Sequence, residues 1–402
     1  MLSRREVLVW AAFFVAVSAL LVLTGFASDD PDSALYADIS AKLAQLPASR
    51  WIAPEWWGFW DSQGLFREHP AGIYLLPAAL SRLGIPAIQA AYIVGIGAGL
   101  GSLLLIGWIV SRIGSPPEGR AMLVLLQFMP VAFLFRIRAN HEYPMLFCLL
   151  AVLVGLDGVR RSSLWWAVWW TVVVALAFTA ALLVKGVFIA LIFLAAGLWM
   201  LINPTRAAGS ILRPIVACLF ACVVMMGVGV AYDRAYLGLT GEHFWRPYWE
   251  RQLGPLTIAT PIEGATTLVE HVIFYISRLL WHAAPWSFAA FAIAWKCRKS
   301  LGKMWRTGAD RPKRGLVFAV AFIVLAVALL SPSSRFAERY AFYATYALGA
   351  LGALAAWRAW PPVSRVVTSL EHRVPAFPAA LWLALMVGRL VLGPFLPRIS
   401  LQ

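Results

Sequence analysis

Stretches of apolar residues long enough to form transmembrane helices recur along the whole 402-residue chain. In hydrocarbon every backbone polar group must be hydrogen-bonded within its own element, so runs of roughly 16 to 25 apolar residues predict helices and exclude the short alternating strands of a barrel. Hydrophobic residues make up 61% of the chain, which leaves too little polar surface for a soluble protein. We therefore predict an all-α, polytopic helical membrane protein with about 11 transmembrane helices, in the range of roughly 11 to 13.

Basic residues gather in the loops between the predicted spans and indicate the topology. Arg4 and Arg5 precede the first span, which lacks a signal-peptide cleavage site, so we expect the N-terminus to stay in the cytoplasm. Alternation then places the most basic loop, residues 296–314, in the cytoplasm as well. The net charge of +15 is thus a topology signal, and the expected partner is a lipid bilayer and no nucleic acid. The spans are predicted near residues 6–27, 86–111, 119–135, 142–157, 163–183, 186–202, 211–231, 272–295, 315–331, 340–358 and 376–397.

The loops with unusual polar residues all fall on the predicted external side. Residues 28–70 form the first long external loop and residues 233–271 the second, and the short turns RANHE and SPSSRFAERY face the same side. The first loop mixes acids with aromatic residues, a pattern typical of amphipathic helices on a membrane surface. We expect residues 1–402 to form a single transmembrane domain whose functional site faces outward from a bacterial cytoplasmic membrane.

Six short segments of these loops and their neighbouring spans form a recognisable series. They are DSALYADIS, REHPAGIYLL, RANHEYPMLF, LLVKGVFIAL, FWRPYWERQ with HAAPW, and SRFAERYAFYATYALGAL. In this order they resemble the pattern of GT-C glycosyltransferases that use polyprenyl-phosphate sugars, including the aminoarabinose lipid A transferases and the protein O-mannosyltransferases. The chain departs from that pattern at Leu35 for Arg, at His69 for Lys, at Ala71 and Gly72, and at Val187 for the Pro after Lys-Gly.

The resemblance implies a GT-C fold and an inverting glycosyltransferase. Such an enzyme moves a sugar from a polyprenyl-phosphate donor to a lipid, glycan or protein acceptor on the periplasmic face. The soluble C-terminal domain of the lipid A transferases is expected to be absent, because the chain ends soon after its last predicted span.

Two other functions remain open. One is a transporter or flippase of lipid-linked sugars, although we find no internal repeat. The other is a non-catalytic homologue, which the departures of this chain from the glycosyltransferase pattern favour.

Asp32 and Glu142 are the predicted catalytic carboxylates. An acceptor hydroxyl that attacks an anomeric carbon benefits from a carboxylate that takes its proton, and Asp32 matches the acid of the resembled pattern. The alternative for Asp32 is a helix N-cap, since DSALYADI is a good helix start. Glu142 lies at the turn into a span and fits a helix-start carboxylate equally well.

A donor phosphate needs cations, because negative charge grows on it as the glycosidic bond breaks. Arg138, Lys185 and Arg339 are the cations available on the external side. Each has an alternative interpretation as an interfacial anchor that reaches lipid headgroups. The predicted donor phosphate and sugar-binding residues are Tyr36, His69, Arg138, Lys185, Arg339 and Tyr340.

Glu68 and His69 are the most metal-like pair in the chain, and His141 with Glu142 would add further ligands. We expect that no cofactor is required and keep a divalent metal ion at Glu68 and His69 as the alternative. The second external loop alternates aromatic and charged residues between Glu242 and Gln252. That pattern is typical both of sugar stacking with phosphate contact and of an interfacial aromatic belt.

Overall fold

The computed structural model describes residues 10–18, 30–56, 64–136, 138–253, 261–296, 310–332 and 337–365, with the side chains of 261–267 and 310 left out. These residues are almost entirely helical, with one isolated antiparallel bridge between Glu55 and Leu65. The predicted span at 376–397 and most of that at 6–27 lie outside the described residues. The all-α prediction is confirmed for the part of the chain that the structure describes.

Five helical runs within the described residues are long and apolar enough to cross a membrane. A sixth candidate is the pair Pro116–Phe128 and Pro130–Arg136, which is bent by 69°. The chain is thus a multi-pass membrane protein, and length and composition identify five or six spans in this part of it, short of the predicted eleven. The five runs are α4 (Ala87–Ile113), α7 (Glu142–Arg161), α8 (Leu164–Lys185) continued through η3 (Gly186–Phe188) into α9 (Ile189–Ile202), α10 (Leu212–Thr240), and α15 (Asp310–Leu330).

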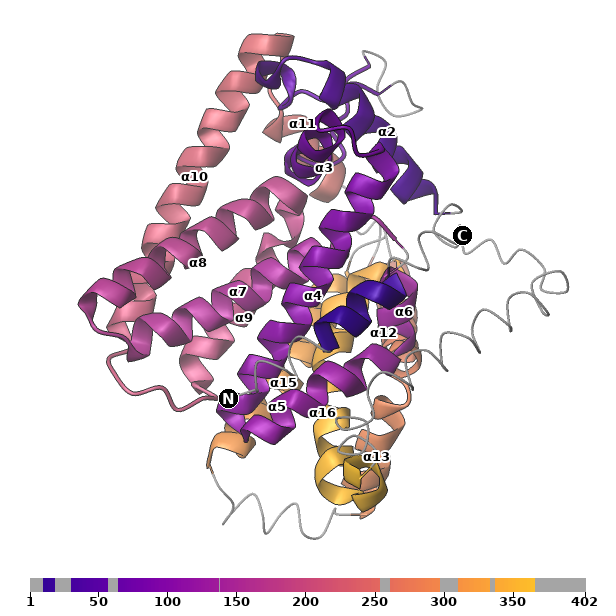
Figure 1. Ribbon diagram of the computed structural model, residues 1–402, viewed down its shortest axis with the longest axis vertical. Helices are drawn as coiled ribbons and strands as arrows, with labels where there is room; N and C mark the ends of the chain where they lie inside the picture. Colours follow the sequence, from indigo (N-terminus) through magenta and orange to yellow (C-terminus); the bar gives the residue numbers. More distant parts are fainter. Residues whose placement is uncertain are drawn as a thin grey trace, which may run out of the picture.

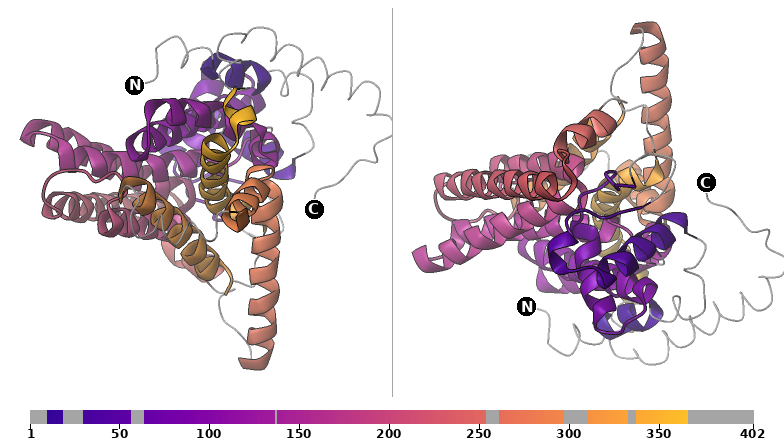
Figure 2. Two further views of the ribbon diagram at one scale, coloured as in Figure 1. Left: turned by 90° about the horizontal axis from the view of Figure 1, so that it is seen from below. Right: turned by 90° about the horizontal axis from the view of Figure 1, so that it is seen from above.

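Two predicted spans are not single helices. The apolar run at 272–295 is divided into α12 (Pro261–His282) and α13 (Trp286–Lys296), and Pro285 lies in the turn between them. The run at 119–135 is divided into α5 (Pro116–Leu125), η2 (Leu126–Phe128) and α6 (Pro130–Arg136). Proline has no N–H to donate and its ring clashes with the preceding turn, so it ends a helix inside an apolar run. Figure 2 shows α12 projecting from the body of the bundle.

Arginines connect loops that the charge pattern assigns to the cytoplasmic side. Arg161 donates to the carbonyl of Thr205 at 2.9 Å, and Arg314 donates to the carbonyl of Ile202 at 3.0 Å. Arg213 donates to the carbonyl of Ser162 at 3.1 Å. The end of the molecule away from α13 carries α2 (Pro31–Gln45), α3 (Gly72–Arg82) and α11 (Trp245–Leu253) (Figure 1). The side of the membrane that each set of loops faces stays a prediction.

Helix α2 belongs to the first predicted external loop and buries one face. Pro31 occupies its first turn, where the missing N–H is not needed. Its buried side chains recur at intervals of three or four residues, the spacing of an amphipathic helix. This face packs against α3 and α4 and carries Tyr36 into the interior. The buried residues of α2 are Ser33, Tyr36, Ala37, Ile39, Ser40 and Leu43.

Glycines allow the closest helix contacts in the bundle. A Cβ atom at Gly119 of α5 would collide with the carbonyl oxygen of Gly107 on α4. A Cβ at Gly352 of α16 (Phe342–Ala359) would collide with the carbonyl oxygen of Trp286, at the start of α13. Small residues at such points let helix backbones approach closely, which is the main source of helix association within a membrane.

Candidate functional site

The end of the molecule that carries α2 brings together the predicted site residues from separate elements. Asp32 lies in the first turn of α2, and His69 lies in the segment before α3. Glu142 begins α7, Lys185 ends α8, and Arg339 lies in η5 (Glu338–Ala341). Residues more than 300 positions apart in the sequence therefore face one centre.

Asp32 pairs with Arg339. The Arg339 guanidinium contacts Asp32 Oδ2, and the two side chains keep 29% and 34% of their surface exposed for Arg339 and Asp32 respectively. The alternative of an N-cap at Asp32 is wrong, because Asp30 caps α2 and accepts a hydrogen bond from the Ser33 N–H at 3.0 Å. The Asp32 carboxylate is thus left to face the site.

Lys185 and His141 form the buried base of the site. The Lys185 ammonium contacts His141 Nε2, and Lys185 is only 3% exposed. On the other side of the ring, His141 Nδ1 lies 3.4 Å from the Tyr36 hydroxyl oxygen. Burial, followed by the charges of Lys185 and Arg339, lowers the pKa of His141 well below its usual range, so this ring is neutral.

Glu142 is the most unusual group of the site. Its carboxylate is 1% exposed, and neither oxygen has a hydrogen-bond partner within the described residues. Oε1 lies 3.0 Å from His141 Nε2, the same nitrogen that contacts the Lys185 Nζ atom. A buried acceptor without a hydrogen bond costs free energy, so this carboxylate is a candidate for a ligand-binding or reacting group.

His69 packs into the same cluster. Its ring centroid lies 5.1 Å from that of His141 and 6.0 Å from that of Tyr36. Burial first, then electrostatic interactions with His141, Lys185 and Arg339, lowers the pKa of His69 well below its usual range. Its Nδ1 atom has no hydrogen-bond partner in the described part of the chain. A neutral imidazole thus stands where the resembled pattern has a lysine.

The predicted metal pair is only partly assembled. Within the described residues, no group of three or more His, Cys, Asp or Glu side chains is arranged to hold a metal ion. The backbone carbonyl of Glu68 accepts a hydrogen bond from Gln252 Nε2 at 3.1 Å, which fixes the segment that carries His69. The metal site at Glu68 and His69 stays a prediction.

Arg138 and Tyr340 lie at the edge of the cluster. Arg138 NH2 is 3.4 Å from Glu338 Oε1, and its Nε is 3.9 Å from Asp30 Oδ1. Its charge is therefore shared by two carboxylates, one beside each member of the Asp32 and Arg339 pair. The Tyr340 ring lies 5.3 Å from the Lys185 ammonium, a distance that suits a cation–π contact.

Three supporting residues were not among the predicted site residues. Asp30 caps α2, and Glu338 joins Arg138 to His282, whose Nε2 lies 3.6 Å from Glu338 Oε2. The hydrogen bond from His282 and the charge of Arg138 lower the pKa of Glu338, although burial acts against this. The cap at Asp30 has a local signal in the order Asp-Pro-Asp-Ser. Glu338 and His282 meet only in the folded chain.

The aromatic residues of α11 form a packed cluster. Tyr248 and Phe244 are fully buried, and their rings stack at 19°. Tyr248 is therefore not available for sugar stacking or for a membrane-interface belt. Arg246 pairs instead with Glu250 on the exposed face of α11, at 3.0 Å.

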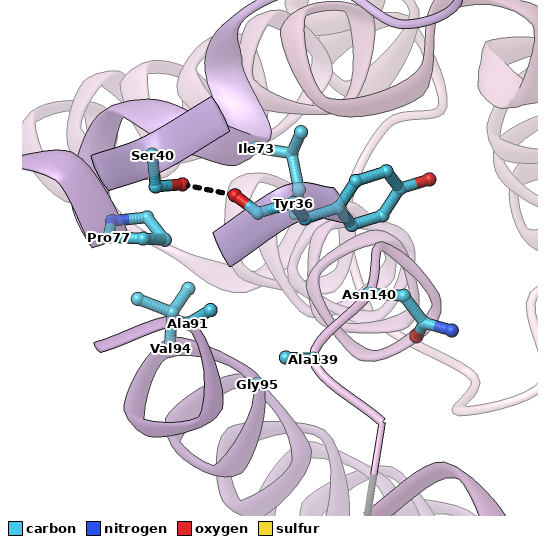
Figure 3. A pocket seen from close by; sticks show the side chains of 9 residues that line it. All are labelled: Tyr36, Ser40, Ile73, Pro77, Ala91, Val94, Gly95, Ala139 and Asn140. Carbon is cyan, nitrogen blue, oxygen red and sulfur yellow. Dashed lines mark hydrogen bonds between the residues drawn. The ribbon is translucent and has the colours of Figure 1, made fainter. Parts of the chain in front are cut away.

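A small cavity lies beside Tyr36, between α2, α3, α4 and the segment before α7 (Figure 3). Its volume is about 10 Å³, the size of one water molecule, so it is not a sugar site. Ser40 donates to the Tyr36 carbonyl at its wall, at 2.7 Å. The Asn140 side chain borders the same cavity and has its Nδ2 atom without a partner in the described residues.

The arrangement of spans and polar loops resembles that of two solved membrane glycosyltransferases of the GT-C fold. The chain is similar to ArnT from Cupriavidus metallidurans bound to undecaprenyl phosphate. The TM-score is 0.64 and the sequence identity 17%, over 89% of this chain and 62% of ArnT. The apo state of the same ArnT gives a TM-score of 0.63 and 18% identity, over 89% of this chain and 61% of ArnT.

The oligosaccharyltransferase of Archaeoglobus fulgidus, in complex with zinc and sulfate, is similar as well. Its TM-score is 0.55 at 15% identity, over 94% of this chain and 52% of that protein. No protein-family model and no curated protein sequence matches the chain. The resemblance seen in the sequence is thus confirmed as a likeness of fold, and the chain spans less than two thirds of the length of these structures.

Proposed function

We propose that this protein is an inverting glycosyltransferase that moves a sugar from a polyprenyl-phosphate donor to a lipid, glycan or protein acceptor. The observation that carries the proposal is the buried Glu142 carboxylate, which has no hydrogen-bond partner in the described residues and lies among His69, His141 and Lys185. Buried polar atoms without hydrogen bonds, beside two cations and a half-buried carboxylate, support a site for a polar, anionic ligand.

The residues can be given roles in this reaction. The bond between the anomeric carbon and the phosphate oxygen breaks, and the phosphate leaves with the electron pair. Lys185 and Arg339 stabilise that growing negative charge. The acceptor oxygen forms a new bond to the anomeric carbon from the opposite face, and its proton passes to the Asp32 carboxylate. Tyr36, His69 and Tyr340 border the sugar, and Glu142 faces the positive charge that develops on the ring.

The Asp32 and Arg339 pair can keep the two roles close together. Arg339 contacts Asp32 through NH1, while its Nε has no hydrogen-bond partner in the described residues. A guanidinium has five N–H donors, so Arg339 can hold the donor phosphate beside the Asp32 carboxylate.

The proposed location follows from the loops. The positive-inside rule favours a cytoplasmic position for the basic loops that Arg161 and Arg314 connect, and we propose that the site faces the periplasmic side of a bacterial cytoplasmic membrane. A reporter fused after α11 and a second one placed near Arg206 should give opposite topologies.

A transferase assay tests the proposal. Purified protein in nanodiscs is incubated with a panel of radiolabelled polyprenyl-phosphate sugars and membrane acceptors, next to Asp32→Asn. We expect donor consumption that falls about 1,000-fold in the variant, since loss of a general base costs about 100- to 10,000-fold. The thermal unfolding temperature, compared in both proteins, controls for misfolding. Equal consumption by both proteins would contradict the proposed role of Asp32.

Transport of a lipid-linked sugar is the second candidate, because the helix pair Pro116–Phe128 and Pro130–Arg136 is broken by 69°. Broken helices at a binding site are typical of secondary transporters. Movement of labelled donor across sealed vesicles without release of polyprenyl phosphate would favour transport over transfer.

A further inference from the structure

Tyr248 lies outside the cluster of site residues but holds the turn that carries one of them. This tyrosine of α11 is fully buried, and its hydroxyl accepts a hydrogen bond from the Val187 N–H at 2.8 Å. Val187 lies two residues after Lys185, in the short η3 segment between α8 and α9. The bond therefore connects two elements that are about 60 residues apart in the sequence.

The Val187 N–H needs a partner from elsewhere. Lys185 has φ −157° and ψ 73°, so the chain leaves the helical conformation there and starts a new helix at Gly186. The first N–H groups of a helix have no acceptor within the helix. When such a donor is buried, a partner outside the helix must satisfy it. Tyr248 supplies that partner.

The Tyr248 ring also packs on the turn itself. A Cβ atom at Gly186 would lie 3.2 Å from both Cε1 and the hydroxyl oxygen of Tyr248, a tighter distance than side chains usually tolerate. The turn is thus held by a hydrogen bond on one residue and by direct packing on the residue before it. The direction of the Lys185 side chain depends on this turn, because Lys185 is the last residue of α8.

The same face of α11 holds a second site segment. Gln252 donates from Nε2 to the carbonyl of Glu68 at 3.1 Å, and Glu68 is the neighbour of His69. Tyr248 and Gln252 are four residues apart, so they lie on one face of the helix in successive turns. One rigid element therefore contacts the backbone beside both Lys185 and His69.

We infer that α11 is a spacer that fixes the separation of Lys185 and His69, and that Tyr248 is the positioning residue on the Lys185 side. The inference rests on the proposed function of the site, since it assigns a purpose to the Lys185 position. Tyr248 touches no reacting group. Its effect on turnover runs through the turn at Gly186 and Val187.

Three variants test the inference in the full-length protein. Tyr248→Phe leaves the Val187 N–H buried without an acceptor, whereas Val187→Pro removes that N–H and keeps a backbone angle suited to a 3₁₀ turn. The double variant Tyr248→Phe with Val187→Pro has neither group. Glu250→Gln changes the exposed face of the same helix, where the Glu250 side chain is 66% exposed, and serves as the control.

We expect kcat/KM for the donor to fall about 10- to 100-fold in Tyr248→Phe, because a small displacement of a reacting group has effects of that order. The double variant should recover most of this loss, since no unpaired donor remains. Glu250→Gln should behave as the unaltered protein. A Tyr248→Phe variant with unchanged kcat and KM, or a double variant as impaired as the single one, would overturn the inference.

Amide hydrogen exchange separates the inference from the proposed function. The Val187 amide should exchange at least about tenfold faster in Tyr248→Phe than in Glu250→Gln, whether or not the protein transfers a sugar. If the unaltered protein consumes no donor while this difference is found, the proposed function fails and the positioning of the turn stands. Equal exchange in the two variants would refute the role of Tyr248.

Discussion

The two ends of α7 carry buried acids that differ in how their charge is satisfied. Asp157 is 1% exposed, and each of its carboxylate oxygens has a partner. Arg161 Nε lies 2.8 Å from Oδ2, and the Thr205 hydroxyl donates to Oδ1. Glu142 is equally buried, yet neither of its oxygens has a hydrogen-bond partner in the described residues. Asp157 connects α7 to Thr205 in the loop after α9, and Glu142 faces the candidate site.

The comparison shows that an acid at one end of a helix can stabilise the fold while an acid at the other end faces the candidate site. A fully partnered buried acid strengthens the fold, and its loss leaves the groups around it unpaired. A buried acid without partners destabilises the fold and persists where it binds or reacts. Glu118 at the Asp157 end follows the first pattern, since Arg358 pairs with it and the Ser115 N–H donates to it at 2.7 Å.

The largest expected effect is on turnover at the Glu142 end. Glu142→Gln keeps the shape of the side chain and removes its charge, so we expect kcat to fall about 100-fold or more. The free energy of unfolding should change by less than about 1 kcal/mol, because neither Glu142 oxygen has a hydrogen bond to lose in the described residues. Donor turnover and thermal unfolding, measured on the same samples, check both parts. A variant that loses stability would show that Glu142 has a structural partner.

Asp157→Ala should have the opposite outcome. The free energy of unfolding is expected to fall by about 3 to 5 kcal/mol, the usual loss when one member of a buried ion pair is removed. The folded fraction should keep its donor affinity, since Asp157 lies at the other end of the helix from Lys185 and Arg339. Detergent titration of unfolding with a donor-binding assay on the folded fraction measures this. If Asp157→Ala lost donor affinity but kept its free energy of unfolding, the proposed difference between the two ends of α7 would be contradicted.

Lower pH should destabilise the site end. Burial lowers the pKa of His69 and of His141 well below the value of about 6.5 in the unfolded chain. As the pH falls through 6.5 toward the lowered values, the unfolded state binds more protons than the folded state, so stability is lost. The unfolding temperature should drop between about pH 7.5 and about pH 5.5. The double variant His69→Asn with His141→Asn should flatten this slope, and an unchanged slope would contradict the assignment.

The smallest effect is expected at an exposed pair of α2. Asp38 and Lys42 lie 2.8 Å apart with about half of each side chain exposed. Asp38→Ala should change stability by less than about 0.5 kcal/mol and leave turnover intact, because solvent screens such pairs. It is a matched control for Asp32→Asn on the same helix. A large loss of stability or turnover in Asp38→Ala would mean that changes anywhere in α2 disturb the site.

Much of the site could be named from local sequence because its residues stand at helix ends in external loops. Asp32, Glu142, Lys185 and Arg339 were each predicted beside an apolar run, and the fold brings them together. Their pairing could not be predicted, since Asp32 and Arg339 are 307 positions apart and no local pattern links them. The role of Asp30 as the cap of α2 was missed in favour of Asp32.

The sequence by itself determined the class of the protein and the sorting of its loops. Burying apolar runs in hydrocarbon requires helices, and the positions of Lys and Arg decide which loops share a side. Both predictions depend on the composition of segments of about 20 residues, so they can be made without knowledge of any tertiary contact. At this level the structure divides two apolar runs into shorter helices, at Pro285 and at Pro130, and joins the predicted spans at 163–183 and 186–202 into one helical run.

Tertiary structure alone decided which polar atoms are satisfied. Glu142 and Asp157 are both acids at the ends of one apolar helix, and sequence treats them alike. Their difference arises because Thr205 and Arg161 supply hydrogen bonds to Asp157, whereas neither Glu142 oxygen has a hydrogen-bond partner in the described residues. Hydrogen bonds depend on distances of a few tenths of an ångström between distant segments, and only the packed bundle fixes those distances.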